Sequence, residues 1–434
     1  MQSDESIRNL LIYSSYDISV FVRQILQGKE SRMGHDTKEK GRGTALGKPI
    51  LWAVWDYIRR SDSIFWGLTI LASVCGILLI ASLQRSGSTN FLLTQSAAVI
   101  LGYAAAVFLS LIDYHYWNRI WWGVGGLALL LTGAVFFVGI QIAGTDDVGW
   151  IRLPGGLTFQ PSELTKICFI LTFSHHLALL QERERLRRFS GVLTLILHAM
   201  IPVGLIHLQG DDGAALIFAL LAVIMSFAAG VPLRYFIILL TLILTAIPLA
   251  WFRIFNNDQK NRLLVLFTSD DSMLRTYGWQ QYQGKLSIAS GGLFGKGYYN
   301  GPRVAENVVP YQENDFIFTV AGEEWGFLGC AAVLVLLALL LLKILRMAAR
   351  AADSFGRSIV IGFFALVGTQ VLINIGMVLG VLPVIGVTLP FFSAGGTSVI
   401  CLYLGVGLVQ SVSMHPADIS SLPLKPPSHI VMRK

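Results

Sequence analysis

The chain has 434 residues, of which 54% are hydrophobic and only 14% are charged, and its formal net charge is +7. Soluble globular proteins carry about 25% charged residues, so this composition excludes a soluble fold, a disordered chain and a collagen-like fibre. At roughly 20 residues for each membrane-spanning helix, the chain has room for about ten spans. The basic excess does not indicate nucleic-acid binding, because most basic residues flank apolar runs, where membrane topology explains them.

The N-terminal part, residues 1–60, is predicted to be a cytoplasmic tail. Residues 28–48 are rich in glycine and charge and almost free of apolar side chains, which is typical of disorder. Residues 6–27 hold enough apolar side chains for an amphipathic helix lying on the membrane, or for a weakly structured tail. Residues 50–60 have the tryptophans and arginines of an interfacial lead-in, with the aromatic rings at the level of the lipid headgroups.

Ten apolar runs follow, each long enough to cross a membrane as a helix. If the N-terminus is cytoplasmic, the inside loops are rich in arginine and lysine, whereas the short outside loops hold only Arg85 and Arg152. This bias predicts that both termini are cytoplasmic. The predicted spans cover residues 64–83, 92–112, 120–140, 163–180, 190–208, 213–229, 233–254, 325–345, 359–380 and 396–413.

Residues 255–324 separate the seventh and eighth spans and would form an extracellular loop far longer than an ordinary connection. The aromatic side chains and glycine-rich centre of this loop favour an ordered, functional segment over a linker. The chain is therefore predicted to be an all-α polytopic membrane protein. Its domains are the tail over 1–60, a membrane domain of ten transmembrane helices over 61–413, and a cytoplasmic C-terminal tail over 414–434.

The start of the fourth span carries an ionisable pair, Glu163 and Lys166, three residues apart and hence on one face of a helix. Ionisable side chains in a membrane helix face protein or a water-filled cavity. The pair therefore predicts either a polar floor for a lipid headgroup or a helix cap with a stabilising ion pair.

Two further segments carry polar or helix-breaking residues between spans. Asp211 and Asp212 lie between glycines before the sixth span, where they serve catalysis or cap the helix. Residues 382–398 contain two prolines and several glycines but no charge. Broken backbone at membrane depth must be buried or line a cavity, so we expect a re-entrant loop that lines the site, with a kinked helix start as the alternative.

The long loop supplies the candidate catalytic group. Asp270 and Asp271 are adjacent, and Arg262, Arg275 and Lys285 lie near them in the sequence. A partly buried carboxylate near cations can act as a general base. The alternative is a solvated turn, because most adjacent aspartates are of that kind.

These motifs together resemble those of the SEDS proteins, the RodA and FtsW group of peptidoglycan glycosyltransferases. The resemblance covers about residues 60–413. The matching stretches are FQPSELTK at 159–166, QGDDG at 209–213, SIASGGLFGKGYYNG at 287–301, NDFIFTVAGEEWGFLG at 314–329 and LPVIGVTLPFFSAGGTS at 382–398.

The resemblance implies an inverting enzyme that polymerises lipid II into glycan strands at the outer face of the bacterial cytoplasmic membrane, for cell-shape or division-linked wall synthesis. Asp271 best matches the family's catalytic aspartate and Asp270 is second, although the family's DPxGxGYQ stretch reads DDSMLRTYGWQQYQ here. The family's arginine before its WI pair falls on Gly149, and Arg152 would replace it. The candidate substrate-binding residues are Lys166, Glu163, Arg152, Arg262, Lys285, Asp211, Asp315 and Ser393.

The resemblance also implies a class B penicillin-binding protein as a partner, together with membrane lipids, and it allows a divalent cation, Mg²⁺ or Mn²⁺, at the pyrophosphate. No zinc site is expected, because the four cysteines lie inside apolar runs without CxxC spacing. Two other functions stay open: a flippase or transporter of the lipid-linked precursor, and a non-catalytic scaffold for a penicillin-binding protein. The charged outer loop favours the enzyme, since transporters keep their ionisable groups near the midplane.

Overall fold

The computed structural model of the protein describes residues 47–86, 90–141, 148–154, 158–253, 255–268 and 270–415. The chain forms two units, residues 1–57 and 58–434. Helix α2 (Gly47–Arg60) carries exposed Trp52 and Trp55 and ends on two arginines. The prediction for residues 6–27, and nearly all of that for 28–48, lies outside the described residues.

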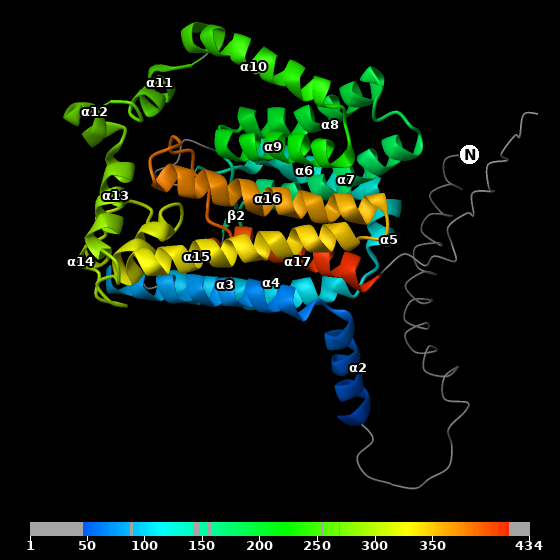
Figure 1. Ribbon diagram of the computed structural model, residues 1–434, viewed down its shortest axis with the longest axis horizontal. Coiled ribbons are helices and arrows are strands. Elements are labelled where there is room, and N and C mark those ends of the chain that lie inside the picture. Colours follow the sequence, from blue (N-terminus) through cyan, green and yellow to red (C-terminus); the bar gives the residue numbers. More distant parts are fainter. Residues whose placement is uncertain are drawn as a thin grey trace, which may run out of the picture. The chain divides into compact units, whose positions relative to one another are not determined.

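The unit 58–434 is built from helices that run alongside one another (Figure 1). Among its described residues, ten helices are long and apolar enough to cross a membrane, which confirms the ten predicted spans. A helix satisfies its backbone hydrogen bonds internally, so an apolar run folds in this way in lipid. The ten helices are α3 (Ser63–Ser82), α4 (Asn90–Ser110), α6 (Trp121–Val138), α7 (Pro161–Glu182), α8 (Phe189–Leu208), α9 (Asp212–Ala229), α10 (Leu233–Arg253), α15 (Ile317–Arg350), α16 (Ser354–Val378) and α17 (Gly396–Met414).

Short elements connect these helices. Strands β1 (Ile151–Arg152) and β2 (Thr158–Phe159) pair antiparallel, with Ile151 opposite Phe159. The segment 255–324 folds into four short helices at one end of the bundle (Figure 1). The remaining short elements are η1 (Leu83–Ser86), α5 (Tyr114–Arg119), α11 (Asn257–Leu264), α12 (Asp271–Thr276), α13 (Trp279–Gly291) and α14 (Pro302–Ala305).

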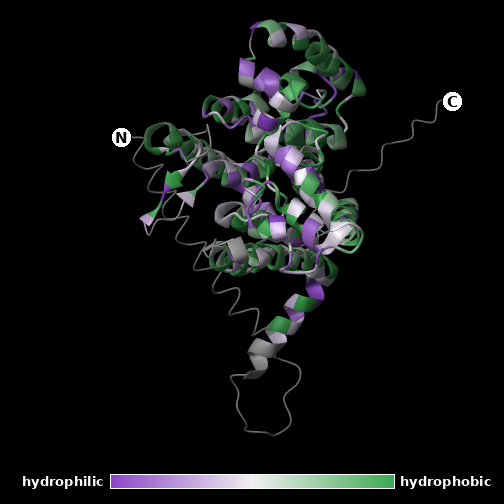
Figure 2. Ribbon diagram, turned by 90° about the vertical axis from the view of Figure 1, so that its left-hand side faces the viewer, coloured by the Kyte–Doolittle hydropathy of each residue, from purple (hydrophilic) through white to green (hydrophobic). Residues whose placement is uncertain are grey.

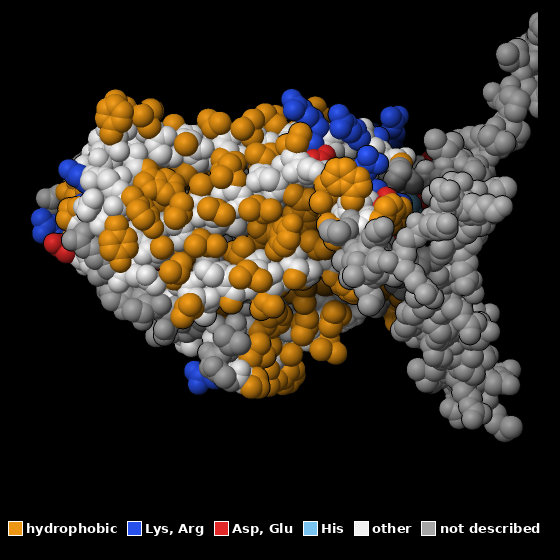
Figure 3. All heavy atoms as spheres, turned by 90° about the horizontal axis from the view of Figure 1, so that it is seen from below, with side chains coloured by type: hydrophobic (Ala, Val, Ile, Leu, Met, Phe, Trp, Pro, Cys, Tyr) orange, Lys and Arg blue, Asp and Glu red, His pale blue; other side chains and the backbone are white. Residues whose placement is uncertain are grey.

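Burial is uneven among the ten long helices. Helices α7, α16 and α17 bury most of their residues, whereas α10 has none buried. Hydrophobic side chains cover much of the face in Figure 3, and basic side chains gather mainly towards its ends. Hydrophilic residues lie among the hydrophobic helices in the end view of Figure 2. The bundle thus has a buried centre and an apolar outer surface, as expected for helices in lipid.

Helix α15 is broken at Gly326, whose φ of 67° lies in the left-handed region that glycine adopts without strain. The predicted start at 325 falls at this break, but the helix begins eight residues earlier. That prediction was wrong because Glu323 and Glu324, which gave the segment the look of a loop, are buried in helical turns.

Backbone groups after α13 replace the hydrogen bonds that the break removes from α15. The amides of Phe327 and Leu328 donate to the carbonyls of Gly292 (2.9 Å) and Leu293 (3.2 Å). In return, the amides of Lys296 and Gly297 donate to the carbonyls of Glu323 (2.9 Å) and Glu324 (3.0 Å) at the end of the first helical part. The segment after α13 is therefore fixed to α15 by main-chain contacts that depend on no side chain.

Candidate active site

Residues 379–395 connect α16 to α17 as irregular backbone, so the segment predicted at 382–398 begins as a loop and not as a kinked helix start. Residues 387–394 of this loop are largely buried, whereas 379–386 are exposed or half-buried, and we call 379–395 the buried loop after its second half. Phe391 and Phe392 are buried in it. Asn374 of α16 donates to the carbonyl of Val387 (2.7 Å), and Gln281 of α13 donates to that of Leu382 (2.7 Å). Side-chain amides thus satisfy carbonyls that have no helical partner.

The hydroxyl of Ser393 serves this buried loop. It donates to the carbonyl of Asn314 at 2.6 Å and accepts from the amide of Leu389 at 2.8 Å. The carbonyl of Ser393 accepts from Gln95 of α4 at 3.1 Å. Both hydrogen-bonding roles of the hydroxyl are therefore used within the protein, and the residue shapes the site.

Glu163 and Lys166 lie in the first two turns of α7 and form an ion pair, with Nζ and Oε1 2.9 Å apart. The Lys166 side chain is only 2% exposed. Glu163 also lines a small cavity beside the buried loop. The ion pair predicted from the spacing is therefore present, and one of its members lines this cavity. The other polar residues of the cavity wall are Gln370, Thr388, Ser393 and Ser398.

Asp211 has the capping role that the sequence offered as one alternative. Its Oδ1 accepts from the amide of Ala214 (2.8 Å) at the start of α9, and its Oδ2 accepts from Gln160 (3.2 Å) just before α7. A Cβ atom on Gly213 would lie 2.3 Å from the carbonyl oxygen of Ile385. The starts of α7 and α9 and the buried loop therefore lie close together.

Asp315 lies just before α15, outside the membrane-spanning helices. Its carbonyl accepts from Asn374 at 2.8 Å. Burial, followed by the nearby charges of Glu313 and Asp211, raises the pKa of Asp315 to about 7. This carboxyl can therefore gain or lose a proton near neutral pH, unlike an ordinary aspartate.

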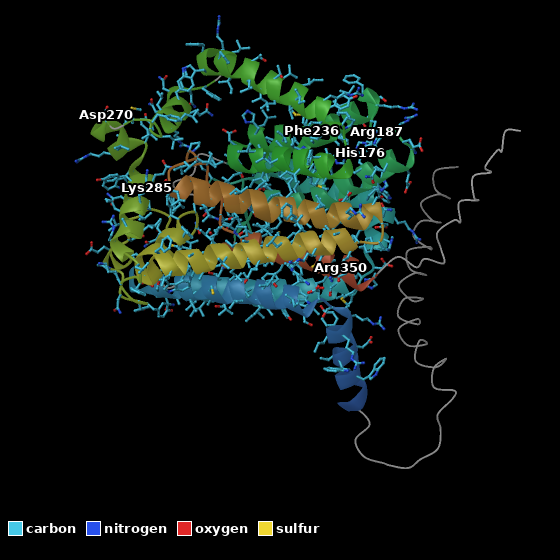
Figure 4. All side chains as sticks on the ribbon, viewed as in Figure 1. His176, Arg187, Phe236, Asp270, Lys285 and Arg350 are labelled. Atoms are coloured by element: carbon cyan, nitrogen blue, oxygen red, sulfur yellow. The ribbon has the colours of Figure 1, made fainter. Side chains whose placement is uncertain are left out.

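The adjacent aspartates, Asp270 and Asp271, lie at the start of α12, one of the short helices of the 255–324 segment. Asp270 caps α12, accepts from the amide (3.0 Å) and hydroxyl (2.9 Å) of Ser272, and is exposed at the tip of the segment in Figure 4. Asp271 is the first residue of α12, and its side chain lies outside the described residues. Arg262 is exposed on α11.

Two cations predicted to bind substrate lie on other elements. The Lys285 side chain, exposed on α13, has its Nζ 2.5 Å from where a Cβ atom on Gly380 would lie, at the C-terminal end of α16. A cation is favourable there, because carbonyl groups point out of a helix at that end. Arg152 is exposed on β1, whose partner strand β2 accepts a hydrogen bond from Thr397 of α17 through the carbonyl of Thr158 (3.2 Å).

The structure therefore brings Glu163, Lys166 and Ser393 to one cavity region and sets Asp211 near Asp315. The remaining candidates are spread over the exposed elements β1, α11, α12 and α13.

Sequence reasoning missed the amide side chains that hold the buried loop. Gln95 and Asn374 lie in predicted spans, and Gln281 lies on α13 in the long segment between the seventh and eighth spans. The sequence does carry a signal for Gln95 and Asn374, because a polar side chain inside an apolar run must find a partner in protein. The partner itself could not be read from the sequence, since Gln95 contacts a loop 298 residues away.

A divalent cation finds no matching ligand set in the described residues. No three side chains of histidine, cysteine, aspartate or glutamate there are grouped so that they could hold a metal ion. A cluster of that kind is what an ion held by protein alone would need, whereas magnesium at a substrate pyrophosphate needs only one or two carboxylates beside the phosphate oxygens.

Comparison with protein families identifies this architecture. A family model described as "Cell cycle protein", for FtsW, RodA and SpoVE, matches residues 61–418. The probable peptidoglycan glycosyltransferase FtsW of Geobacter metallireducens is 32% identical over 364 residues, which are 82% of this chain and 95% of that protein. The peptidoglycan glycosyltransferase MrdB of Escherichia coli is 35% identical over 289 residues, 66% of this chain and 77% of that protein.

Two solved structures are similar in fold as well as in sequence. A chain from the structure titled "Structural coordination of polymerization and crosslinking by a peptidoglycan synthase complex" has a TM-score of 0.70 and 29% identity, over 81% of this chain and 97% of its own length. The rod shape determining protein RodA of Thermus thermophilus has a TM-score of 0.61 and 28% identity, over 82% of this chain and 98% of its own.

Proposed function

Since the chain belongs to the SEDS (FtsW/RodA) family of peptidoglycan glycosyltransferases, we propose that it polymerises lipid II into glycan strands at the outer face of the bacterial cytoplasmic membrane. The observation that carries this proposal is the family match over residues 61–418, which contains the buried Glu163–Lys166 pair and the cavity beside the 379–395 loop. We take residues 61–413 as the catalytic membrane domain.

The proposed topology has both termini in the cytoplasm and the segment 255–324 outside. The separation of labelled residues in Figure 4 supports it: Asp270 and Lys285 lie at one end of the bundle, and Arg187 and Arg350 at the other. The arginine-rich loops gather at the second end, as the positive-inside rule requires of a cytoplasmic face. The substrate's sugars and pyrophosphate would then meet the first end.

The chemical step is a single displacement at the anomeric carbon of the donor sugar. Asp271, or Asp270 as the second candidate, takes the proton from the 4-hydroxyl of the acceptor sugar as that oxygen attacks. The new bond joins this oxygen to the anomeric carbon, while the bond from that carbon to the undecaprenyl pyrophosphate breaks. One displacement inverts the centre, so an α-linked donor gives a β-linked glycan.

Cations must stabilise the charge on the departing pyrophosphate. Arg262, Lys285 and Arg152 are exposed cations, which supports a role in binding an anionic substrate. Lys166 is buried and already paired with Glu163. We therefore propose that Lys166 mainly positions the cavity wall and that the exposed cations contact the phosphates.

A class B penicillin-binding protein is the proposed partner. A solved chain with 29% identity to this one comes from a structure of a peptidoglycan synthase complex, described as coordinating polymerization and crosslinking. We propose that α15 and α16, the eighth and ninth spans, form the contact. Co-purification from membranes, with and without substitutions on the exposed face of these helices, tests the assignment.

The decisive experiment is polymerisation of lipid II by the purified chain. Asp271→Ala should lower the rate roughly 10²–10⁴-fold, the usual contribution of a general base, and should leave the protein folded. Asp270→Ala tests the second candidate and should cost far less; if it abolishes polymerisation while Asp271→Ala does not, the base is Asp270. If neither substitution changes the rate, the assignment of this loop to catalysis fails.

The same preparation separates the enzyme from its two alternatives. A flippase would move lipid II across vesicle membranes and form no polymer. A scaffold would bind its penicillin-binding protein normally after both aspartates are removed and would still support growth. Polymer formed by the chain alone, and lost with Asp271→Ala, excludes both.

A further inference from the structure

Four large apolar residues lie where the segment after α13 adjoins the break in α15. We call them the outer apolar patch: Leu293, Phe294, Phe327 and Leu328, with exposed fractions of 53%, 75%, 64% and 50%. The amide of Leu328 donates to the carbonyl of Leu293 at 3.2 Å, so the two segments adjoin. In water, such a group of exposed apolar side chains is unfavourable and marks a contact surface.

The depth of the patch in the membrane can be measured along α15. Lys343 forms an ion pair with Asp62 at 2.6 Å, and a charged pair belongs at or beyond the edge of the hydrocarbon. Residues 327–342, immediately before Lys343, contain no charged side chain. These 16 residues rise about 24 Å as a helix. The hydrocarbon core is about 30 Å thick, so Phe327 lies inside it or at its far edge.

Helix α3 provides a second measure of depth in the membrane, counted from Asp62 of the same ion pair. Leu78 follows Asp62 by 16 residues, again about 24 Å along a helix. The hydroxyl of Tyr298 donates to the carbonyl of Leu78 at 3.2 Å. The segment after α13 is thus held at the same depth by contacts to two different helices, and any tilt of these helices would place it deeper.

We propose that residues 292–299 dip into the membrane leaflet on this side and anchor the 255–324 segment there. Leu293 and Phe294 lie among the acyl chains of phospholipids. The exposed Lys296 reaches the phosphates, and Tyr298 lies at the interface that tyrosine favours. Lipid is the occupant because the patch continues the apolar surface of α15, a candidate membrane span.

This proposal does not depend on the enzymatic function, since it uses only the depth of α3 and α15. If residues 292–299 enter the leaflet, the short helices α11–α14 would lie on the membrane surface instead of standing above it. A lipid-linked substrate presents its phosphates at that same level, so any group on these helices meets the substrate without a further movement out of the aqueous phase.

Nitroxide accessibility in vesicles tests the depth directly. In a Cys75→Ser background the three other cysteines are buried, so a new cysteine is the site that labels. Phe294→Cys and the matched control Glu306→Cys, an exposed position on the same segment, are each spin-labelled in the full chain. The proteins are placed in vesicles of phosphatidylethanolamine and phosphatidylglycerol. Collisions are measured with oxygen, which concentrates in lipid, and with a water-soluble nickel chelate.

The label at 294 should show a severalfold higher ratio of oxygen to nickel accessibility than the label at 306. Equal nickel accessibility at the two sites would overturn the proposal, because the patch would then face water. Exclusion of both reagents at 294 would also overturn it, since protein would then cover the patch, as a partner's transmembrane helix or a second copy would. Leu293→Cys repeats the measurement within the patch and should agree with 294.

Discussion

The 379–395 loop and the short helices α11 and α12 lie at the same end of the bundle, yet the chain holds them in different ways (Figure 1). The loop is largely buried over residues 387–394, and Gln95, Gln281 and Asn374 bond to its backbone from three different helices. At the start of α12, Asp270 is exposed, and its side chain bonds to Ser272, two positions away.

The shape of the cavity and the proposed chemistry therefore depend on separate parts of the chain. Side chains of the buried loop have protein partners and contribute to folding. On the short helices, the described side chains of Arg262 and Asp270 are exposed and can contact a substrate. Substitutions in the first region should therefore change stability before activity, and substitutions in the second should change activity with little effect on stability.

The largest stability effect is expected from Lys166→Met. It leaves the carboxylate of Glu163 without its partner in a mostly buried place, and breaking a buried pair in this way costs about 3–5 kcal/mol. The midpoint of thermal unfolding should fall markedly. The double variant Glu163→Gln/Lys166→Met should recover much of the loss. An unchanged midpoint combined with lost polymerisation would instead make Lys166 a substrate contact.

A smaller loss of stability is expected from Ser393→Ala. The change removes the partner of the Leu389 amide and of the Asn314 carbonyl, and an unsatisfied buried group costs about 1–3 kcal/mol. Ser398→Ala is the matched control, because that hydroxyl lines the same cavity but bonds only to Gly395, three residues away. Equal unfolding midpoints for the two variants would contradict the role given to Ser393.

The pH dependence of stability should report on Asp315. Its pKa is raised from 3.8 to about 7, so the folded protein binds this proton more tightly than the unfolded chain. This contribution to stability is complete below about pH 4 and is lost as the pH rises through about 7. The unfolding midpoint should therefore fall across this range, and less steeply in Asp315→Asn. The exposed Asp270→Asn should keep the wild-type slope; a slope unchanged in Asp315→Asn would place the titration elsewhere.

The smallest effect on folding is expected from Arg262→Gln on α11. Exposed substitutions usually change the free energy of unfolding by less than about 0.5 kcal/mol. If Arg262 attracts the pyrophosphate, KM for lipid II should rise while kcat is kept, and added salt should reduce the difference. Arg350→Gln, at the opposite end of the bundle in Figure 4, should leave KM unchanged.

Much of the fold could be predicted from the sequence, because each apolar run forms one helix and the bounds of nine spans lie within a few residues of the prediction. The exception is α15. Its first turns carry two charged side chains, and only the contact with the segment after α13 explains why they are helical and buried. No local pattern encodes a helix whose hydrogen bonds are completed by another segment.

The site divides in the same way. The Glu163–Lys166 ion pair follows from a spacing of three residues on a helix and could be predicted. The role of Ser393 depends on the carbonyl of Asn314, 79 residues away, and could not. Asp271 stays a prediction, because its assignment depends on a motif match and its side chain lies outside the described residues.

The break at Gly326 bears on the order in which the protein folds. The backbone groups that complete α15 there lie about 30 residues earlier in the chain, and closing so short a loop costs little entropy. We expect α13, its following segment and α15 to assemble as soon as the eighth span has been made. Helices α16 and α17 and the loop between them are synthesised later, so they would close the cavity against an end of the bundle that is already in place.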